Sequence, residues 1–270
     1  MRCEIILDGS EIEKGQRILK AMAKAGPSCG VDINFTRAYR GGSDLLMIYG
    51  LGHQVRGKYF KKHVAQGGHA ICWDLGYFGR GQTKSFPMRL SIDHAHPQAW
   101  MRTMLSDRWD AANIPLRNEY NPTGPIVLAG TGNKERNRLG LSGCEWEENK
   151  FKEIRAVYPS TPIIYRPKGN SKEPLGDCIV ASEGKIEDVI RGASLVVVKH
   201  SNVAVDACIA GIPVVCEDGA AASLYGNDLY KPLNPSEAER YQFLCNLAYW
   251  QWRSEEASAC WHFIKRNLCV

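Results

Sequence analysis

Short apolar runs alternate with helical patterns along this chain, and that alternation most constrains the fold. Leu45–Tyr49, Ile126–Ala129 and Leu195–Val198 contain no charged side chain. Strands that are apolar on both faces are typical of parallel sheets covered by helices on each side. Glu145–Val157 and Val203–Ala210, the second ended by a glycine, have the pattern of such helices. We therefore expect an α/β protein built on parallel sheets.

A segment rich in proline and glycine divides this pattern in two. Asn113–Pro125 contains three prolines and a glycine and has no usable periodicity, as expected of a linker. A length of 270 residues also favours two small domains. We expect an N-terminal α/β lobe over 1–118, a C-terminal α/β lobe over 119–245 and a helical tail over 246–270. The predicted architecture is two Rossmann-like lobes with a cleft between them.

The same reasoning predicts further elements in each lobe. The other expected strands are Cys3–Leu7, Ala70–Trp73, Pro162–Tyr165 and Val214–Cys216. The other expected helices are Glu11–Ala25, Gln54–Gln66, Trp100–Trp109, Ile186–Arg191 and the segment from Ser236 onward, which is rich in Trp and Tyr.

Composition excludes several classes of protein. The hydrophobic fraction of 44% and the charged fraction of 23% are ordinary for a globular chain and argue against disorder. The net charge of +5 permits a polyanionic partner such as DNA without requiring one. The N-terminal apolar run is too short for a signal peptide, and no run approaches the ~20 apolar residues of a membrane span. We expect a cytoplasmic protein without a membrane span.

Cysteine is abundant but not arranged as a metal site or a disulfide framework. The ten cysteines are scattered, and no two form a C-x-x-C pair. Several, such as Cys72 and Cys216, sit inside apolar runs, where cysteine behaves as a small buried hydrophobe. We interpret them as reduced thiols and expect no metal site.

The turn Lys199-His200-Ser201-Asn202 follows an apolar strand and opens a helix. Open α/β sheets bind ligands at this edge, and the positive end of a helix suits a phosphate. Ser201 or Asn202 can equally serve as a helix cap, and His200 as an ordinary turn residue. These four residues alone leave both interpretations open.

The whole segment resembles the H-S-[ST]-x-x-x-[ED]-A-x-x-x-G-x-P-V-[VI] signature of the C-terminal lobe of GT-B glycosyltransferases, including capsular-polysaccharide-type enzymes. The matching residues are His200, Ser201, Asn202, Asp206, Ala207, Gly211, Pro213, Val214 and Val215. In that group the histidine and hydroxyl residues face the donor's diphosphate. The acidic residue lies near the nucleotide or anchors the structure. This chain departs at Asn202 and Asp206, and the shorter Asp206 side chain leaves its ligand role open.

Two more turns are expected on the donor side. Arg166 and Lys168 flank a proline after a strand, similar to the basic turn of these enzymes that approaches the donor phosphates. Gly130-Thr131-Gly132 follows the first strand of the second lobe, where backbone amides can approach a ligand. This turn is neither a P-loop nor a Rossmann fingerprint, and a plain tight turn is the alternative.

In the first lobe, Cys72–Arg80 resembles the E-x-G-[YF]-x-R stretch of capsule-type transferases, with Asp74 in place of Glu. A carboxylate at the end of a strand can act as the general base for an acceptor hydroxyl. Asp93 and His94 compete for this role, and an unidentified base or a retaining mechanism without one stays open. The residues expected on the acceptor side are Gly52, His53 and Arg80.

The resemblance implies an enzyme of the hexosyltransferase class, with a nucleotide-sugar, expected to be a UDP-sugar, as co-substrate and no other cofactor. No D-x-D metal clamp occurs in the sequence, which favours metal-independent transfer supported by cations and helix dipoles. The expected partner is therefore the nucleotide-sugar donor, with phosphate charge met by the protein.

Two acceptor classes stay open at this point. One is a saccharide. The other is a hydroxymethylated pyrimidine in phage DNA, because small GT-B-like enzymes of that kind occur in bacteriophages and aromatic residues of the tail could stack on bases. Two other functions also stay open, a sugar-nucleotide epimerase or hydrolase on the same fold and a non-enzymatic nucleic-acid-binding protein.

Overall fold

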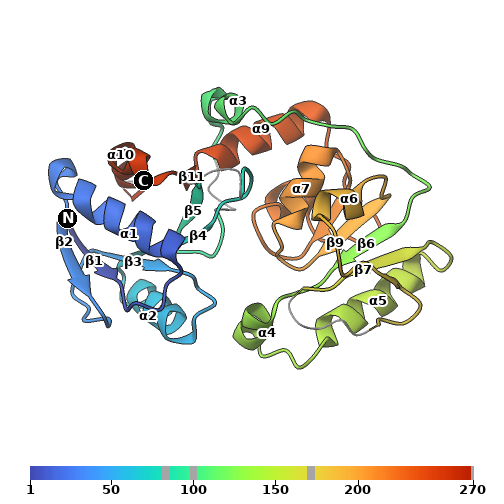
Figure 1. Cartoon of the computed structure of the whole chain (residues 1–270), viewed down its shortest axis with the longest axis horizontal. Helices are drawn as coiled ribbons and strands as arrows, with labels where there is room; N and C mark the ends of the chain where they lie inside the picture. Colours follow the sequence, from blue (N-terminus) through green and yellow to red (C-terminus); the bar gives the residue numbers. More distant parts are fainter. Residues whose placement is uncertain (81–85, 98–101, 169–173, 269–270) are drawn as a thin grey trace. The chain divides into compact units, whose positions relative to one another are not determined.

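The computed structural model describes residues 1–80, 86–97, 102–168 and 174–268. The chain forms two compact units (Figure 1). Unit 1 comprises Met1–Pro97 and Ala248–Val270, and unit 2 comprises Gln98–Leu247. Each unit has its own sheet, which confirms the expected pair of α/β lobes.

Unit 1 is built on a six-stranded sheet, sheet A, with the order β11-β5-β4-β3-β1-β2. The strands are β1 Arg2–Ile6, β2 Asp32–Thr36, β3 Leu45–Tyr49, β4 His69–Leu75, β5 Met88–Ile92 and β11 Gln251–Trp252. β1 to β4 pair in parallel, whereas β5 and β11 pair antiparallel to their neighbours. Sheet A is therefore mixed, in contrast to the predicted parallel sheet.

Helices cover both faces of sheet A. The helices of unit 1 are α1 Glu13–Ala25, η1 Pro27–Cys29, α2 Gln54–Ala65, η2 Ser254–Glu256 and α10 Ala257–Leu268. Phe60 of α2 packs with Leu46 and Ile48 of β3. Alternate strand residues point to opposite faces, so Tyr49 of β3 points to the other face of the sheet. There its ring lies against Gly15 of α1.

The end of the chain completes unit 1. β11 pairs with β5, and the Trp261 indole of α10 donates a 2.8 Å hydrogen bond to the Met22 carbonyl of α1. Trp250, Trp252 and Trp261 are at most 5% exposed. These three indoles are core residues and are not available to stack on bases, contrary to the role considered for them from the sequence.

Unit 2 contains a five-stranded sheet, sheet B, that is parallel throughout, with the order β10-β9-β6-β7-β8. Its strands are β6 Ile126–Ala129, β7 Ile163–Arg166, β8 Ile179–Val180, β9 Leu195–Val198 and β10 Val214–Cys216. Its helices are α3 Asp107–Ala112, α4 Asn133–Leu139, α5 Glu145–Val157, α6 Ile186–Ile190, α7 Val203–Ala210, α8 Ala222–Tyr225 and α9 Glu237–Ala248. Trp146 and Ile154 of α5 pack against Leu128, Tyr165 and Val197 of the sheet.

The division of the chain differs from the sequence boundaries in two places. The units separate at residues 97 and 98, not at 118 and 119, and 248–270 is part of unit 1. The helix expected over Trp100–Trp109 is wrong for most of its described length, since residues 102–105 are not helical and α3 begins at Asp107. Residues 98–101 lie outside the described part.

Contacts with α9 explain the extended segment before α3. The Met104 amide donates to Asn246 Oδ1 at 2.9 Å, and Gln242 Nε2 donates to the Met104 carbonyl at 3.0 Å. Both backbone groups of Met104 are therefore satisfied by side chains of another helix, so no helical turn is needed there.

Two further expectations concern the whole chain. All nine cysteines among the described residues are free, and seven of them are buried. Across 1–80, 86–97, 102–168 and 174–268, no helix combines the length and apolar character needed to cross a bilayer.

Candidate functional site

The three turns predicted on the donor side lie along one edge of sheet B. β9, β6 and β7 are adjacent and parallel, so the segments that follow them emerge at the same edge. The Gly130 amide donates to the Arg166 carbonyl at 2.9 Å. A Cβ atom added at Gly132 would lie 3.6 Å from Lys168 Cδ, so the lysine stem passes close to this glycine. The tertiary structure thus joins turns that are far apart in sequence.

The turn between β9 and α7 holds the signature histidine. His200 Nε2 lies 3.8 Å from Glu135 Oε2 of α4, and the His200 side chain is 18% exposed. The Ser201 hydroxyl accepts a long 3.4 Å bond from the Val203 amide, and the Ser201 carbonyl accepts from the Ala204 amide at 3.1 Å. The turn therefore places a half-buried imidazole beside the positive end of α7.

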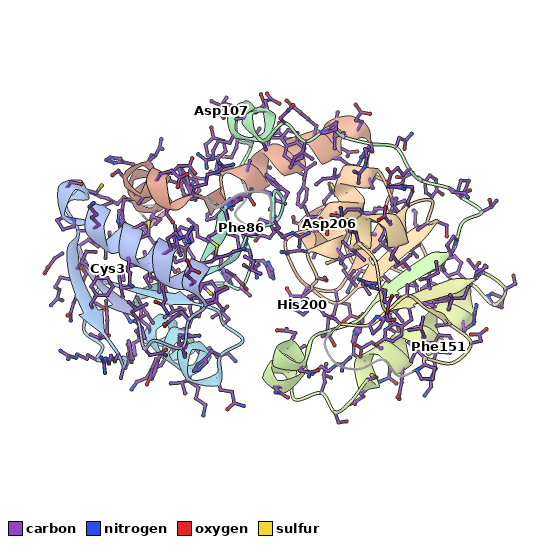
Figure 2. The ribbon with its side chains drawn as sticks, viewed as in Figure 1. Cys3, Phe86, Asp107, Phe151, His200 and Asp206 are labelled. Atoms are coloured by element: carbon purple, nitrogen blue, oxygen red, sulfur yellow. The ribbon has the colours of Figure 1, made fainter. Side chains whose placement is uncertain are left out.

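Asn202 and Asp206 occupy the start of this helix. Asn202 precedes α7 and makes no side-chain capping bond, while the Asp206 amide donates to the Asn202 carbonyl at 3.2 Å. Asp206 lies in the first turn of α7 and is 7% exposed, and Figure 2 labels it together with His200. A carboxylate in the first turn is favourably placed in the field of the helix.

Glu217, which follows β10, gathers three donors behind the histidine turn. Its carboxylate accepts from Lys199 Nζ at 2.9 Å, Lys150 Nζ at 2.8 Å and the Trp146 indole at 3.0 Å. Burial alone would raise the pKa of Glu217, but the hydrogen bonds and charges of the two lysines outweigh it and lower the pKa. Lys199 is thus paired with Glu217, in a cluster that the sequence analysis did not predict.

Arg166 is held by the loop that follows β8. Its guanidinium donates to the carbonyls of Ala181 at 2.7 Å, Glu183 at 2.5 Å and Gly184 at 2.7 Å. Carbonyl oxygens satisfy hydrogen bonds without cancelling the charge, so Arg166 stays a local cation while it also fixes this loop.

Thr131 has a supporting position beneath the glycine turn. It is 2% exposed, and its amide and hydroxyl both donate to Glu147 Oε1, at 2.7 and 2.8 Å. Arg136 pairs with the same buried carboxylate at 2.7 Å. Burial opposes the charge on Arg136, yet its hydrogen bond and ion pair with Glu147 raise its pKa. This network holds the Gly130–Gly132 turn in place.

In unit 1, Asp74 lies near the carboxyl end of β4. Asp74 Oδ2 accepts from Arg89 Nη2 at 2.9 Å, Asp74 Oδ1 accepts from the Leu75 amide at 2.7 Å, and 39% of the side chain is exposed. Arg89 also contacts the His96 ring and lies 5.3 Å from the centroid of the Tyr77 ring. Asp74 is therefore accessible and oriented by a half-buried arginine.

Asp93 lies at the opposite end of β4, because β5 runs antiparallel to β4. Its carboxylate accepts from the Ala70 amide at 2.7 Å and pairs with His69 Nδ1 at 2.8 Å. Ala70 and Asp74 are four positions apart on β4, a distance of about 13 Å at roughly 3.3 Å per residue. His94 is exposed beside Asp93. The structure does not bring the competing base candidates together.

The acceptor-side candidates occupy turns at the same edge as Asp74. The Gly50 amide donates to the Trp73 carbonyl at 2.8 Å, which ties the turn after β3 to β4. Gly52 and His53 are half-buried in that turn, immediately before α2, and Arg80 is half-buried in the turn after β4. These residues share one sheet edge in unit 1.

A polar cluster at this edge was not found from the sequence. The buried Arg56 Nη1 donates to Asp8 Oδ1 at 3.1 Å, Ser10 Oγ at 2.9 Å and Glu11 Oε1 at 2.9 Å. Burial alone would raise the pKa of Asp8, but hydrogen bonds from Ser10 and the charges of Arg56 and His53 lower it. The sequence signal that could have revealed this cluster is the Asp8-Gly9-Ser10 turn directly after a strand.

Within the described ranges, no group of three or more His, Cys, Asp and Glu side chains is placed to hold a metal ion.

Comparisons with known proteins agree with the architecture. No protein-family model and no curated protein sequence matches the chain. Among solved structures, the beta Kdo 2,7 transferase of Thermosulfurimonas dismutans KpsC matches with a TM-score of 0.55 and 15% identity, covering 98% of this chain and 99% of that one. The beta Kdo 2,4 transferase of the same KpsC matches with a TM-score of 0.53 and 13% identity, covering 93% and 91%. This likeness confirms the predicted resemblance in fold to capsule-type GT-B enzymes.

Proposed function

We propose that this protein transfers a sugar from a nucleotide-sugar donor to an acceptor hydroxyl. The observation that carries the proposal is the meeting of the His200, Gly130 and Lys168 turns at the carboxyl edge of one parallel sheet. Ligands of open α/β sheets bind at this edge, and a fold shared with sugar transferases supports the same reaction class.

Unit 2 binds the donor in this proposal. When the bond between the sugar and the diphosphate breaks, negative charge develops on the departing oxygen. His200, Lys168 and the first turn of α7 supply positive charge and hydrogen-bond donors at the position of that group. Arg166 contributes charge and holds the 181–184 loop, while Asp206 and Asn202 shape the start of the helix.

Asp74 is the proposed general base of the reaction. Its accessible carboxylate takes the proton of the acceptor hydroxyl as that oxygen bonds to the sugar, and Arg89 fixes its orientation. Asp93 is less suited to this role, because its side chain is less exposed than that of Asp74 and lies at the other end of β4, away from the acceptor-side turns.

The donor assignment is tested by calorimetry with a panel of nucleotide-sugars that includes UDP-sugars. We expect His200→Ala to weaken binding of the preferred donor and to lower kcat roughly 10²–10³-fold, as loss of one charge-stabilising donor does in other enzymes. His262→Ala, at an exposed position of α10, is the matched control. Equal donor affinity in His200→Ala and the control would remove His200 from the site.

The reaction itself is tested by mass spectrometry of products. We propose metal-independent transfer, so excess EDTA should leave the rate unchanged, and a complete loss of activity with EDTA would contradict this part. An altered free nucleotide-sugar formed without acceptor would instead indicate an epimerase or hydrolase.

For the acceptor, two classes belong in the same experiment. The names of the structural neighbours support a saccharide hydroxyl, and the net charge of +5 is consistent with hydroxymethylated pyrimidine in phage DNA. A mass increase of one sugar on either acceptor identifies that acceptor as the substrate. If the protein binds a donor but no acceptor gains mass, the proposed transfer is contradicted.

A further inference from the structure

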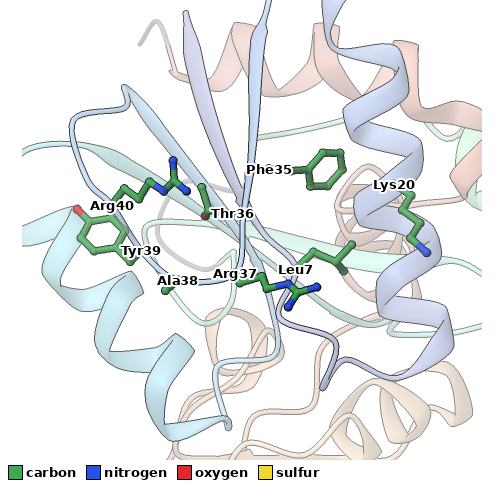
Figure 3. Close-up of a pocket in the computed structure, with 8 residues that line it drawn as sticks. All are labelled: Leu7, Lys20, Phe35, Thr36, Arg37, Ala38, Tyr39 and Arg40. Carbon is green, nitrogen blue, oxygen red and sulfur yellow. The ribbon is translucent and has the colours of Figure 1, made fainter.

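Unit 1 contains an open pocket of about 730 Å³ at the carboxyl end of β2. Figure 3 shows its lining residues, which come from the end of β1, from β2 with the loop after it, and from α1. The pocket size suits one ligand of roughly nucleotide dimensions, since small-molecule sites span about 300–1,000 Å³. None of its lining residues belongs to the proposed donor or base residues.

Three cations line this pocket, and no acidic residue does. Lys20 lies on α1, and Arg37 and Arg40 lie in the loop after β2. None of the three side chains has an ion-pair partner within the part of the chain that the structure describes. Cations gathered without acidic partners repel one another, so their presence around one pocket favours a bound anion.

The loop that carries the two arginines is held from below by Glu4. This carboxylate is 1% exposed and accepts from the Thr36 hydroxyl at 3.0 Å, the Arg40 amide at 2.7 Å and the Gly41 amide at 3.2 Å. Gly41 has φ of +79°, a conformation that glycine adopts at little cost. The arginine loop is therefore preorganised, which reduces the entropy lost when a ligand binds.

Aromatic side chains complete the pocket. The Phe35 side chain belongs to the edge strand β2, and the residue is 47% exposed. The Tyr39 ring is fixed, because it stacks on Tyr59 at 5.6 Å and its hydroxyl bonds to His63 and Gln66. An exposed ring among unpaired cations is the combination with which proteins bind single-stranded nucleic acid, by stacking bases and contacting phosphates.

We propose that this pocket binds nucleotide units of a single-stranded nucleic acid. Phosphate groups lie between Lys20, Arg37 and Arg40, and a base stacks on Phe35. The pocket and Asp74 share one edge of sheet A, three strand spacings apart, or about 14 Å at roughly 4.8 Å per spacing. A bound strand that follows this edge reaches Asp74, so the pocket positions a nucleic-acid acceptor. That last role rests on the proposed function, whereas the binding itself does not.

The test is fluorescence anisotropy with a labelled thymidine oligonucleotide, measured over a range of salt concentrations. We expect the double variant Arg37→Gln/Arg40→Gln to weaken binding about tenfold or more. It should also reduce the slope of log K against log salt by about 1.4, which corresponds to two lost phosphate contacts to a single strand. The matched control Lys152→Gln/Lys231→Gln removes two exposed charges from unit 2 and should bind as the unmodified protein does.

Phe35→Ala separates stacking from charge. We expect at least a fivefold loss of oligonucleotide affinity with an unchanged salt slope. Phe35→Trp, which keeps a stacking face, should restore binding, and an unchanged thermal unfolding midpoint shows that the variants are folded. Free thymidine monophosphate serves as a competitor. Displacement of the strand only at a much higher concentration than unlabelled oligonucleotide needs supports a strand site, and displacement at an equal or lower concentration contradicts it.

Three results would overturn the proposal. The first is that the oligonucleotide does not bind at low salt. The second is that the arginine and Phe35 variants bind it as tightly as the unmodified protein does. The third is that an acidic oligosaccharide displaces the oligonucleotide at a lower concentration than unlabelled strand does. Nucleotide-sugar calorimetry on the same variants separates the two proposals. If the protein binds a nucleotide-sugar but no oligonucleotide, only the proposal for the pocket is refuted. If it binds the oligonucleotide but no nucleotide-sugar, only the proposed sugar transfer is refuted.

Discussion

Sheet B and sheet A present their candidate residues in different ways. In sheet B, every strand is parallel, and the three predicted turns after β9, β6 and β7 lie along one edge. In sheet A, β5 reverses direction, so Asp74 and Asp93 lie at opposite ends of β4. Strand direction therefore decides which residues can share a site. The carboxyl ends of neighbouring strands lie at the same edge of a sheet only where those strands are parallel.

The largest expected effect tests the sheet A side of this comparison. Asp74→Asn should lower kcat roughly 10²–10⁴-fold, as loss of a general base does, while donor affinity stays unchanged. Steady-state kinetics and donor calorimetry measure the two quantities separately. Turnover equal to that of the unmodified protein would show that the carboxyl edge of sheet A does not supply the base.

The next effect concerns the support of the sheet B edge. Arg136→Met leaves the fully buried Glu147 carboxylate without its ionic partner, which should lower the free energy of unfolding by about 3–5 kcal/mol. Urea denaturation measures this change. Arg191→Met is the control, since its pair with Asp188 is exposed and should contribute about 1 kcal/mol or less. Equal losses in the two variants would contradict a special role for the buried pair.

A smaller effect depends on pH. Because the folded state lowers the pKa of Glu217, its ionised form stabilises the protein at neutral pH, and this contribution is lost as the pH falls through the folded pKa. Glu217→Gln should cost about 1.5–3 kcal/mol at pH 7, with the difference from the unmodified protein shrinking below about pH 5. Denaturation at several pH values measures it. If the difference in free energy of unfolding between Glu217→Gln and the unmodified protein grows toward low pH, the assigned direction of the pKa shift is wrong. Glu237→Gln, at an exposed position, serves as the control.

The smallest effect completes the comparison within sheet A. Asp93→Asn should change kcat by less than about twofold and stability by about 1 kcal/mol or less, because its ion pair with His69 is partly exposed. Asn also tolerates the left-handed backbone found there, with φ of +59°. The same assays used for Asp74→Asn apply. A loss of turnover as large as in Asp74→Asn would place the base at the other edge of sheet A.

Much of unit 2 was predictable because its signals are local. The bounds of β6, α5, β9, α7 and β10 agree with the sequence prediction to the residue. Continuous apolar runs and a glycine such as Gly211 after a helix determine these elements with little help from other parts of the chain. β2 was missed for the opposite reason, since this edge strand is largely exposed and polar and only its pairing with β1 defines it.

The site was predictable in part. The sequence pattern placed the His200 turn directly after a strand and Asp74 near the carboxyl end of another, and the structure agrees with both positions. The roles of His200 and Asp74 stay predictions. It could not show that the Arg166 side chain holds the carbonyls of 181–184, or that Arg56 gathers Asp8 and Glu11. Such pairings join residues far apart in sequence, and composition and periodicity carry no record of them.

Hydrophobic periodicity acts over a few residues, so the sequence alone predicted two α/β lobes and the exact bounds of β3, β6, β9 and β10. Three features are visible only in the tertiary structure. β11 and α10 belong to unit 1, and Trp250, Trp252 and Trp261 are core residues. Arg37, Arg40 and Phe35 line one pocket. The physical reason is that burial and charge proximity depend on which strands pair and in which direction, and pairing is settled by packing across the whole unit.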